Sequence, residues 1–366
     1  MAEYLIILIW PAVIAGVTTL SGKKKAIRVL NQTEYRYSFL PLLFAVIPLI
    51  YYTANRSLYF GDTSAYVQSF NQMPTEYSLI SDYMTTVNKD EFFYLTSSLI
   101  KIFITNNYTT YFAILAVFHI LCILFVYKKY SDNAFLSLFL FLASTDYISW
   151  MYNGIRQFTA VCLTFLCFGL ILKKKFIPAI IIIAFASFFH GSALIVIPFI
   201  LIAQGKAWNK NTLLFIFGII ITLIFVEEFT SILDTVLEDT QYTNVVSDWQ
   251  GSGDDGTNFI RVLVYSIPAV LSLYGKNKIK NINNHVINLC TNMSIASAGL
   301  YVVSMFTSGV YIGRLPIYFS LYSYILLPWE IKNLFSKDVA RTITTIMIIA
   351  YMGYYFYSLK FGFGLI

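Results

Sequence analysis

An arginine followed by a glutamine stands at the head of an apolar run in residues 152–160, YNGIRQFTA. The guanidinium group of Arg156 can bind phosphate or carboxylate groups through a planar fork of donors. Neighbouring positions on a helix point about 100° apart, so Arg156 and Gln157 together offer a fork of donors and an amide to a ligand lying across the helix end. The alternative is an arginine that only anchors the helix at a membrane surface. The neighbouring Gln157 favours the ligand-binding interpretation, because an arginine that only anchors the helix needs no amide partner.

A histidine lies at the turn between two short apolar runs in residues 187–198, SFFHGSALIVIP. From Lys175 to His190 the chain has about 15 residues, or roughly 22 Å of helix at 1.5 Å per residue. Since the hydrocarbon core of a membrane is about 30 Å thick, this turn lies below the membrane surface and needs a covering of protein or a water-filled cavity. We expect His190 to line the floor of a crevice, where a side chain that titrates near neutral pH can act as a general base. A core histidine bonded to a hydroxyl or carbonyl group is the alternative.

Two acidic residues are further candidates for proton transfer. In residues 60–70, FGDTSAYVQSF, Asp62 and Tyr66 lie one turn apart on one helix face. Asp62 can equally cap the helix, the commonest role of an aspartate after a glycine. In residues 88–95, NKDEFFYL, Glu91 follows Asn88 at the spacing of a capping box, which makes Glu91 a weaker catalytic candidate than Asp62.

The composition identifies the environment of these side chains. The 366 residues are 58% hydrophobic and 12% charged, whereas a soluble domain carries about 25% charged residues. Their mean hydropathy is +0.68. Because helices satisfy their own backbone groups in a bilayer, we predict an all-α polytopic membrane protein with about 12 transmembrane helices in one domain, residues 1–366. The predicted helices cover about 4–20, 38–54, 109–127, 133–149, 156–172, 176–190, 191–203, 212–229, 259–275, 285–306, 312–328 and 342–359.

The basic residues predict the orientation of the chain, because lysine and arginine prefer cytoplasmic loops. Of the 25 basic residues, 18 follow helices that end on one side. They are Lys23, Lys24, Lys25, Arg28, Arg36, Lys128, Lys129, Lys173, Lys174, Lys175, Lys206, Lys210, Lys276, Lys278, Lys280, Lys332, Lys337 and Arg341. Both termini and the segments 55–108 and 230–258 then lie outside. The net charge of +6 is therefore a topology signal and does not indicate a nucleic-acid partner.

The two outer segments differ in character. Residues 92–105 would reverse every later helix if they crossed the membrane, so we expect an amphipathic helix that lies on the outer membrane surface or dips partway into it, with Lys101 extending to water. Residues 251–258, GSGDDGTN, are typical of a mobile tip, with a lid over a site as the alternative.

Metal ions, cofactors and disulfides are not predicted. Asp254 and Asp255 lie in the polar tip, and the 3 histidines are far apart in sequence, so no ligand set is evident. Four cysteines fall inside predicted helices and imply no disulfide framework: Cys122, Cys162, Cys167 and Cys290. The first helix has no basic region before it and no small-residue cleavage site, so we expect it to be retained.

Four arginines lie at the predicted outer boundary: Arg56, Arg156, Arg261 and Arg314. Because a planar fork binds phosphate in a way that lysine cannot copy, arginines beside a sunken His190 are suited to a lipid-linked pyrophosphate. We predict that Arg156 and Arg314 hold the pyrophosphate as it gains negative charge, and that His190 or Asp62 accepts a proton.

The sequence resembles the EpsG/Wzy-like polysaccharide polymerases of bacteria. The matching segments are GDTSAY, DEFFYL, YNGIRQFTA, HGSALIVIP and GRLPIYF, in this order. The family pattern falls on Asp62, Tyr66, Glu91, Asn153, Arg156, Gln157, His190, Ser192 and Arg314. The resemblance implies transfer of a growing glycan from undecaprenyl pyrophosphate onto a lipid-linked oligosaccharide repeat unit at the outer side of the bacterial cytoplasmic membrane. Gln157 and Asn153 would orient sugar hydroxyls, and a chain-length regulator protein is an implied partner.

Two other classes of function stay open. An O-antigen ligase or a membrane acyltransferase would use similar histidine and arginine chemistry at the outer face. A flippase or other transporter of lipid-linked glycans would also have about twelve helices, but transporters commonly show repeated halves and charges near the midplane of the membrane. In this chain the strongest polar residues lie at the predicted outer end instead.

Overall fold

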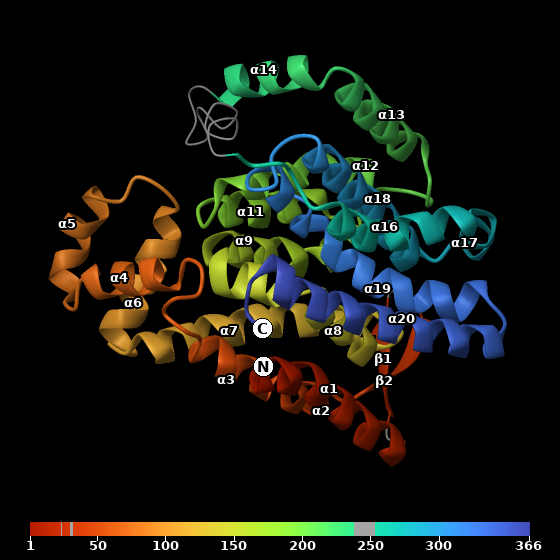
Figure 1. Ribbon diagram of the computed structural model, residues 1–366, viewed down its shortest axis with the longest axis horizontal. Helices are drawn as coiled ribbons and strands as arrows, with labels where there is room; N and C mark the ends of the chain where they lie inside the picture. Colours follow the sequence, from red (N-terminus) through yellow and green to blue (C-terminus); the bar gives the residue numbers. More distant parts are fainter. Residues whose placement is uncertain (23, 30–31, 238–252) are drawn as a thin grey trace. The chain divides into compact units, whose positions relative to one another are not determined.

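The computed structural model describes residues 1–22, 24–29, 32–237 and 253–366, and nearly all of its elements are helices (Figure 1). The chain divides into two compact units. The first unit contains Met1–Gly169, Ile177–Leu194 and Lys337–Ile366, and the second contains Leu170–Phe176 and Ile195–Ser336.

The first unit is built around the long helix α7, Tyr108–Tyr130, which packs against α3 and α9. Its elements are α1 (Ala2–Ser21), β1 (Lys24–Val29), β2 (Gln32–Tyr37), α2 (Phe39–Ala45), α3 (Ile47–Ala54), α4 (Thr63–Gln72), η1 (Tyr77–Leu79), α5 (Ile80–Thr85), α6 (Glu91–Phe103), α7, α8 (Ala134–Ala143), η2 (Tyr147–Asn153), α9 (Ile155–Leu166), α11 (Phe176–Ser187), η3 (Gly191–Ile195), α20 (Lys337–Tyr357) and η5 (Ser358–Gly362). Inside the apolar core, His119 of α7 is hydrogen bonded through Nε2 to the hydroxyl of Thr159 on α9, 2.9 Å away.

The second unit has its core where α18, His285–Met305, packs against α16 and α19. Its elements are α12 (Val196–Ile202), α13 (Lys210–Ile224), α14 (Val226–Leu237), α16 (Phe259–Tyr274), α17 (Lys276–Ile282), α18, η4 (Ile312–Arg314) and α19 (Ile317–Leu334), while α10 (Phe168–Leu172) lies at the boundary of the two units. Two buried amides of α18 fix the loop before α13, because Asn288 and Asn292 accept hydrogen bonds from the backbone N–H groups of Ala207 and Trp208.

Each of the twelve predicted apolar runs coincides with a helix or a pair of helices, but the count of about twelve spans is not confirmed. Within the described ranges, 5 helices are long and apolar enough to cross a membrane, or up to 8 if each bent pair is one span. The number of spans is lower than predicted because some pairs of helices bend sharply and other helices are short. The pair α13 and α14 bends by 99°, and Phe39–Ala54, Phe176–Ser187 and Gly191–Ile202 have only 10–17 residues each.

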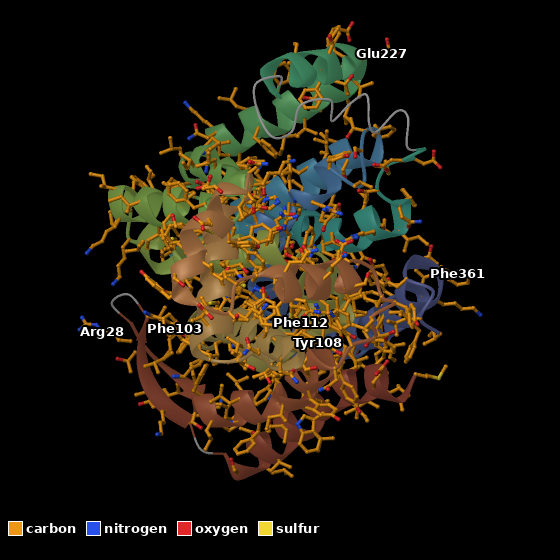
Figure 2. The ribbon with its side chains drawn as sticks, turned by 90° about the vertical axis from the view of Figure 1, so that its left-hand side faces the viewer. Arg28, Phe103, Tyr108, Phe112, Glu227 and Phe361 are labelled. Atoms are coloured by element: carbon orange, nitrogen blue, oxygen red, sulfur yellow. The ribbon has the colours of Figure 1, made fainter. Side chains whose placement is uncertain are left out.

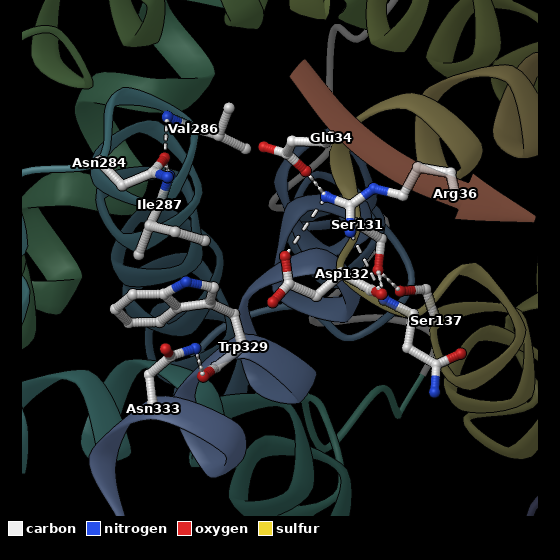
Figure 3. A network of polar contacts seen from close by, with 11 residues as sticks. Glu34, Arg36, Ser131, Asp132, Ser137, Asn284, Val286, Ile287, Trp329 and Asn333 are labelled. Atoms are coloured by element: carbon white, nitrogen blue, oxygen red, sulfur yellow. Dashed lines mark hydrogen bonds and ion pairs between the residues drawn. The ribbon is translucent and has the colours of Figure 1, made fainter. Parts of the chain in front are cut away.

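One element departs from the all-α prediction, because part of the basic segment after α1 forms an antiparallel hairpin of β1 and β2. Alternating apolar and aromatic side chains such as Ile27, Val29 and Tyr35 favour strands. The hairpin is tied to the loop before α8 by Arg36, which forms ion pairs with Glu34 and Asp132 (Figure 3). The Arg36 Nη2 to Asp132 Oδ1 distance is 3.3 Å. A charged loop in the sequence is therefore a small sheet in the structure.

Candidate active site

The start of α9 places Arg156 at the end of an unusual turn. Residues Tyr147–Asn153 form the π-helix η2, and wide turns of this kind are frequent at functional sites. Gly154 follows as the cap of α9, and a Cβ atom there would lie 2.8 Å from the ring of Trp150. Only glycine fits this junction. Arg156 is then the second residue of α9 and is half-buried.

An aspartate that we did not predict as a site residue binds Arg156. The Nη1 atom of Arg156 donates to Oδ2 of Asp90 over 2.7 Å, and the side chains are 33% and 5% exposed. Asp90 caps α6 in the left-handed region, with φ of 53°, which aspartate tolerates better than most residues. Burial raises the pKa of Asp90, and the charge of Arg156 opposes this shift. The ring of Tyr94, one turn along α6, lies 5.9 Å from the guanidinium carbon.

The start of α4 is fastened to the end of η2 beside this ion pair. The backbone N–H of Asp62 donates to Oδ1 of Asn153 over 3.2 Å, and the Tyr66 hydroxyl donates to the carbonyl of Asn153 over 2.9 Å. Gly61 permits this approach, since a Cβ atom there would lie 1.9 Å from Oδ1 of Asn153. Burial raises the pKa of Tyr66, and the neighbouring Arg156 opposes the shift. Asp62, Tyr66, Asn153 and Arg156 are thus brought together.

Asp62 occupies the cap position of α4, which was one of its two predicted roles, but its carboxylate makes no capping hydrogen bond. The side chain is exposed. Its carboxylate therefore lies at the surface, where it can meet a ligand.

Two predicted residues lie differently from the expectation. Glu91 is the first residue of α6, with Asp90 as its cap, so the predicted capping box between Asn88 and Glu91 is wrong. The Glu91 side chain is exposed. Gln157 is buried, with 2% of its surface exposed, so its predicted contact with a ligand requires the amide to leave this position.

His190 lies in the turn that follows α11 and is half-buried. Its Nδ1 atom is hydrogen bonded to the hydroxyl of Ser192 over 2.7 Å, which orients the ring. The same turn contacts the start of α6, because the N–H of Phe92 donates to the carbonyl of Phe188 over 3.2 Å and their rings pack together. His190 and Ser192 therefore belong to a turn that touches α6 two residues beyond Asp90.

Lys101 does not extend to water as predicted. It is 6% exposed, and its Nζ atom donates to the carbonyls of Phe70, Asn71 and Met73 over 2.9, 2.9 and 2.6 Å. These carbonyls terminate α4, and a lysine there satisfies groups that the helix leaves unpaired. Burial lowers the pKa of Lys101. The helix predicted in residues 92–105 is confirmed as α6, with an internal role for its lysine.

Arg56 is also internal and does not lie at the surface as predicted. Its Nε donates to the Thr63 hydroxyl over 3.0 Å, and its Nη1 donates to the carbonyl of Thr53 over 2.7 Å. Its guanidinium carbon lies 3.8 Å from the ring centre of Phe112. Phe112 lies near the start of α7, close to Tyr108 (Figure 2). Burial lowers the pKa of Arg56 to about 10. Arg56 therefore supports the first turn of α4.

Two predicted arginines belong to the second unit. Arg314 ends η4 and is exposed. Arg261, on the first turn of α16, is half-buried, with the rings of Tyr265 and Tyr301 at 5.5 and 5.9 Å. The predicted mobile tip is described from residue 253, and there the carboxylate of Asp254 accepts four hydrogen bonds. Residues 251–252 lie outside the described ranges.

Among the described side chains, no three His, Cys, Asp or Glu residues are grouped to hold a metal ion.

Comparison with known proteins identifies the family. The model of the EpsG family matches residues 39–363, which include every predicted site residue. No curated protein and no solved structure matches the chain. The chain belongs to the EpsG family of Wzy-like polysaccharide polymerases.

Proposed function

We propose that the protein transfers a growing glycan from undecaprenyl pyrophosphate onto a lipid-linked repeat unit, at the outer side of the bacterial cytoplasmic membrane and without a metal ion or cofactor. Family membership supports the class of reaction. The observation that carries the chemistry is the Arg156–Asp90 ion pair, because it holds a half-buried guanidinium group in place beside Asp62, Tyr66 and Asn153.

The ion pair prepares Arg156 for an anionic ligand. Guanidinium carries five N–H donors, and the hydrogen bond to Asp90 uses one nitrogen atom of the fork. The Asp90 side chain is 5% exposed and the Arg156 side chain is 33% exposed, so an entering phosphate would meet the guanidinium group and not the carboxylate. Charge fixed before the reaction stabilises the leaving diphosphate without reorganisation.

In the proposed reaction, the oxygen of an acceptor sugar hydroxyl forms a bond to the anomeric carbon of the donor glycan. The bond from that carbon to the diphosphate oxygen breaks, and the electron pair leaves with the diphosphate. The hydroxyl proton passes to a base, for which His190 is the first choice and Asp62 the second. Ser192 orients His190, and Asn153 with Tyr66 shapes the surface where a sugar would lie.

Complementation tests this proposal. A cell that lacks its polymerase but still flips lipid-linked units is supplied with the protein, and its glycans are separated by length. Restored ladders support a polymerase. Cells that lack this protein test the two alternatives. Full-length unattached chains in such cells would instead show that the protein is a ligase, and accumulation of unflipped units would show that it is a transporter.

Variants of Arg156 connect the function to the site. We expect Arg156→Ala and Arg156→Lys to give single-unit glycans, because lysine lacks the planar fork. Arg341→Ala is the control, since Arg341 is 71% exposed in the same unit. Wild-type chain lengths with both Arg156 variants would refute the diphosphate role.

A further inference from the structure

A carboxylate in the second unit is surrounded by donors from two segments. Oδ1 of Asp254 accepts hydrogen bonds from the N–H groups of Gly256 and Gly309, each over 3.0 Å. Oδ2 accepts from the Ser308 hydroxyl over 2.7 Å and from the Val310 N–H over 2.9 Å. Burial favours the neutral acid, but these donors outweigh burial and lower the pKa of Asp254. The contacts of Asp254 with residues 308–310 are called the Asp254 clasp below.

A second set of contacts holds the same two segments together. The N–H of Thr257 donates to the carbonyl of Ser304 over 2.9 Å, and the Ser304 hydroxyl donates to the Thr257 hydroxyl over 2.8 Å. The backbones touch, because a Cβ atom on Gly256 would lie 2.6 Å from the carbonyl oxygen of Met305. Asp254, Gly256 and Thr257 therefore pack directly on the end of α18 and the turn after it.

The clasp continues to the residue before Arg314. The Ser308 hydroxyl, which donates to Asp254, accepts from the N–H of Tyr311 over 2.9 Å. The Ser308 carbonyl accepts from the N–H of Gly313 over 2.9 Å. A Cβ atom on Gly313 would lie 2.5 Å from the Thr257 hydroxyl, so this position is also closely packed. The backbone is thus fixed up to the point where the exposed Arg314 begins.

We propose that Asp254 is a positioning residue for Arg314: by fixing the turn 308–313, it presents the exposed guanidinium group to a polyprenyl diphosphate. This inference rests on the proposed function, in which both donor and acceptor carry such a diphosphate. Asp254 acts through the backbone, because its contacts go to N–H and hydroxyl groups of the turn. A flexible arginine would lose conformational entropy on binding, and a fixed turn reduces that loss.

A double-mutant cycle tests the coupling. Purified protein elongates a lipid-linked repeat unit, and kcat/KM is measured for Asp254→Ala, Arg314→Ala and the double variant. We expect each single variant to lower kcat/KM about 10-fold and the double variant to be no worse than Arg314→Ala alone. Asp255→Ala is the matched control, since this neighbouring aspartate is exposed, and it should retain wild-type kcat/KM.

A second measurement reports the clasp without activity. Val310 is 46% exposed, so Val310→Cys, with the four native cysteines replaced, should react with a maleimide in detergent solution. We expect labelling to be about 10-fold faster with Asp254→Ala, because this change removes a charged acceptor. Ser308→Ala should increase the labelling rate less than Asp254→Ala does. Ser308→Ala and Asp254→Asn keep the test valid if Asp254→Ala does not fold.

Three results would overturn the inference. Losses that multiply in the double variant would show that Asp254 acts independently of Arg314. If Asp254→Ala kept wild-type kcat/KM while Arg314→Ala lowered it, Arg314 would not need Asp254 to fix its turn. Wild-type kcat/KM with Arg314→Ala would show that Arg314 does not bind the diphosphate, and faster labelling at position 310 would then show that the clasp exists without that role.

Discussion

Two aspartates hold the two candidate phosphate-binding arginines in different ways. In the first unit, Asp90 contacts the guanidinium group of Arg156 itself, 2.7 Å away. In the second unit, Asp254 contacts the backbone and the hydroxyl of the turn that leads to Arg314. Asp90 therefore controls the charge and the direction of its arginine together, whereas Asp254 controls geometry.

This difference has an energetic consequence. A half-buried guanidinium group needs a partner, because removing one member of a buried ion pair leaves an uncompensated charge. For the exposed Arg314, ordering of the backbone that carries the side chain is what improves binding. Arg156 should therefore be sensitive to the chemistry of its aspartate, and Arg314 to the shape of its turn.

The largest expected effect is on the arginines. Arg156→Lys should lower kcat by about 100-fold or more, in the range measured for loss of a fixed donor to a developing negative charge. Arg314→Lys should lower kcat/KM by about 10-fold, because an exposed group contributes less than one that is fixed and partly buried. Turnover of purified protein on lipid-linked repeat units measures both. Equal losses would remove the distinction between the two arginines.

The next effect is on the aspartates. Asp90→Asn should lower kcat about as much as Asp90→Ala, roughly 10- to 100-fold, since either change removes the charge that pairs with Arg156. Asp254→Asn should lower kcat/KM by only about 3-fold, because the amide oxygen keeps part of the acceptor set. The same turnover assay measures these variants. A larger loss for Asp254→Asn than for Asp254→Ala would contradict the geometric role.

The sequence predicts the helices well because apolar runs and polar breaks are local properties. It does not predict how many helices cross a membrane, because the bends that divide them depend on packing. The 99° bend between α13 and α14 falls at Phe225 inside an apolar run, with no proline or glycine to mark it. The hairpin after α1 is missed for a related reason: its basic side chains hide the alternation that favours strands.

The candidate site is predictable in part. Asp62, Tyr66, Asn153 and Arg156 share family motifs, and the structure brings them together. Asp90 is missed because an acid just before an amphipathic helix has the pattern of a cap, and its pairing with Arg156 joins residues 66 positions apart. A local pattern cannot show such a pair.

Whether a long basic side chain is buried or exposed is the hardest feature to predict from the sequence. Lys101 and Arg56 have the sequence context of surface residues, yet both are buried against carbonyl groups. A long aliphatic stem reaches either water or an unpaired carbonyl inside the bundle, and composition does not distinguish the two.

A smaller effect concerns the glycines that let the segments approach. Gly61→Ala should destabilise the first unit by about 1–3 kcal/mol, because the added Cβ would lie 1.9 Å from Oδ1 of Asn153 at a φ of +47°. Gly256→Ala, at φ +83° against the backbone of Met305, should do the same in the second unit. Gly353→Ala, with nothing within 4 Å in a helix, is the control and should be neutral or stabilising. Thermal unfolding in detergent measures all three, and unchanged unfolding temperatures would show that these junctions relax freely.

The smallest effect is on pH dependence, and it separates the two aspartates by sign. The pKa of Asp90 is raised by burial, so its contribution to stability is full below the ordinary pKa of aspartate and is lost as pH rises through the raised value. The pKa of Asp254 is lowered by its donors despite burial, so its contribution is present above the ordinary pKa and is lost as pH falls through the lowered value. Acidification should therefore protonate Asp90 first and weaken its hold on Arg156 while the Asp254 clasp stays intact. Infrared difference spectra of the protonated carboxyl band, assigned with Asp90→Asn and Asp254→Asn, measure the order. Protonation of Asp254 at the higher pH would mean that the clasp donors do not outweigh burial, and that the two aspartates do not differ in the way their contacts indicate.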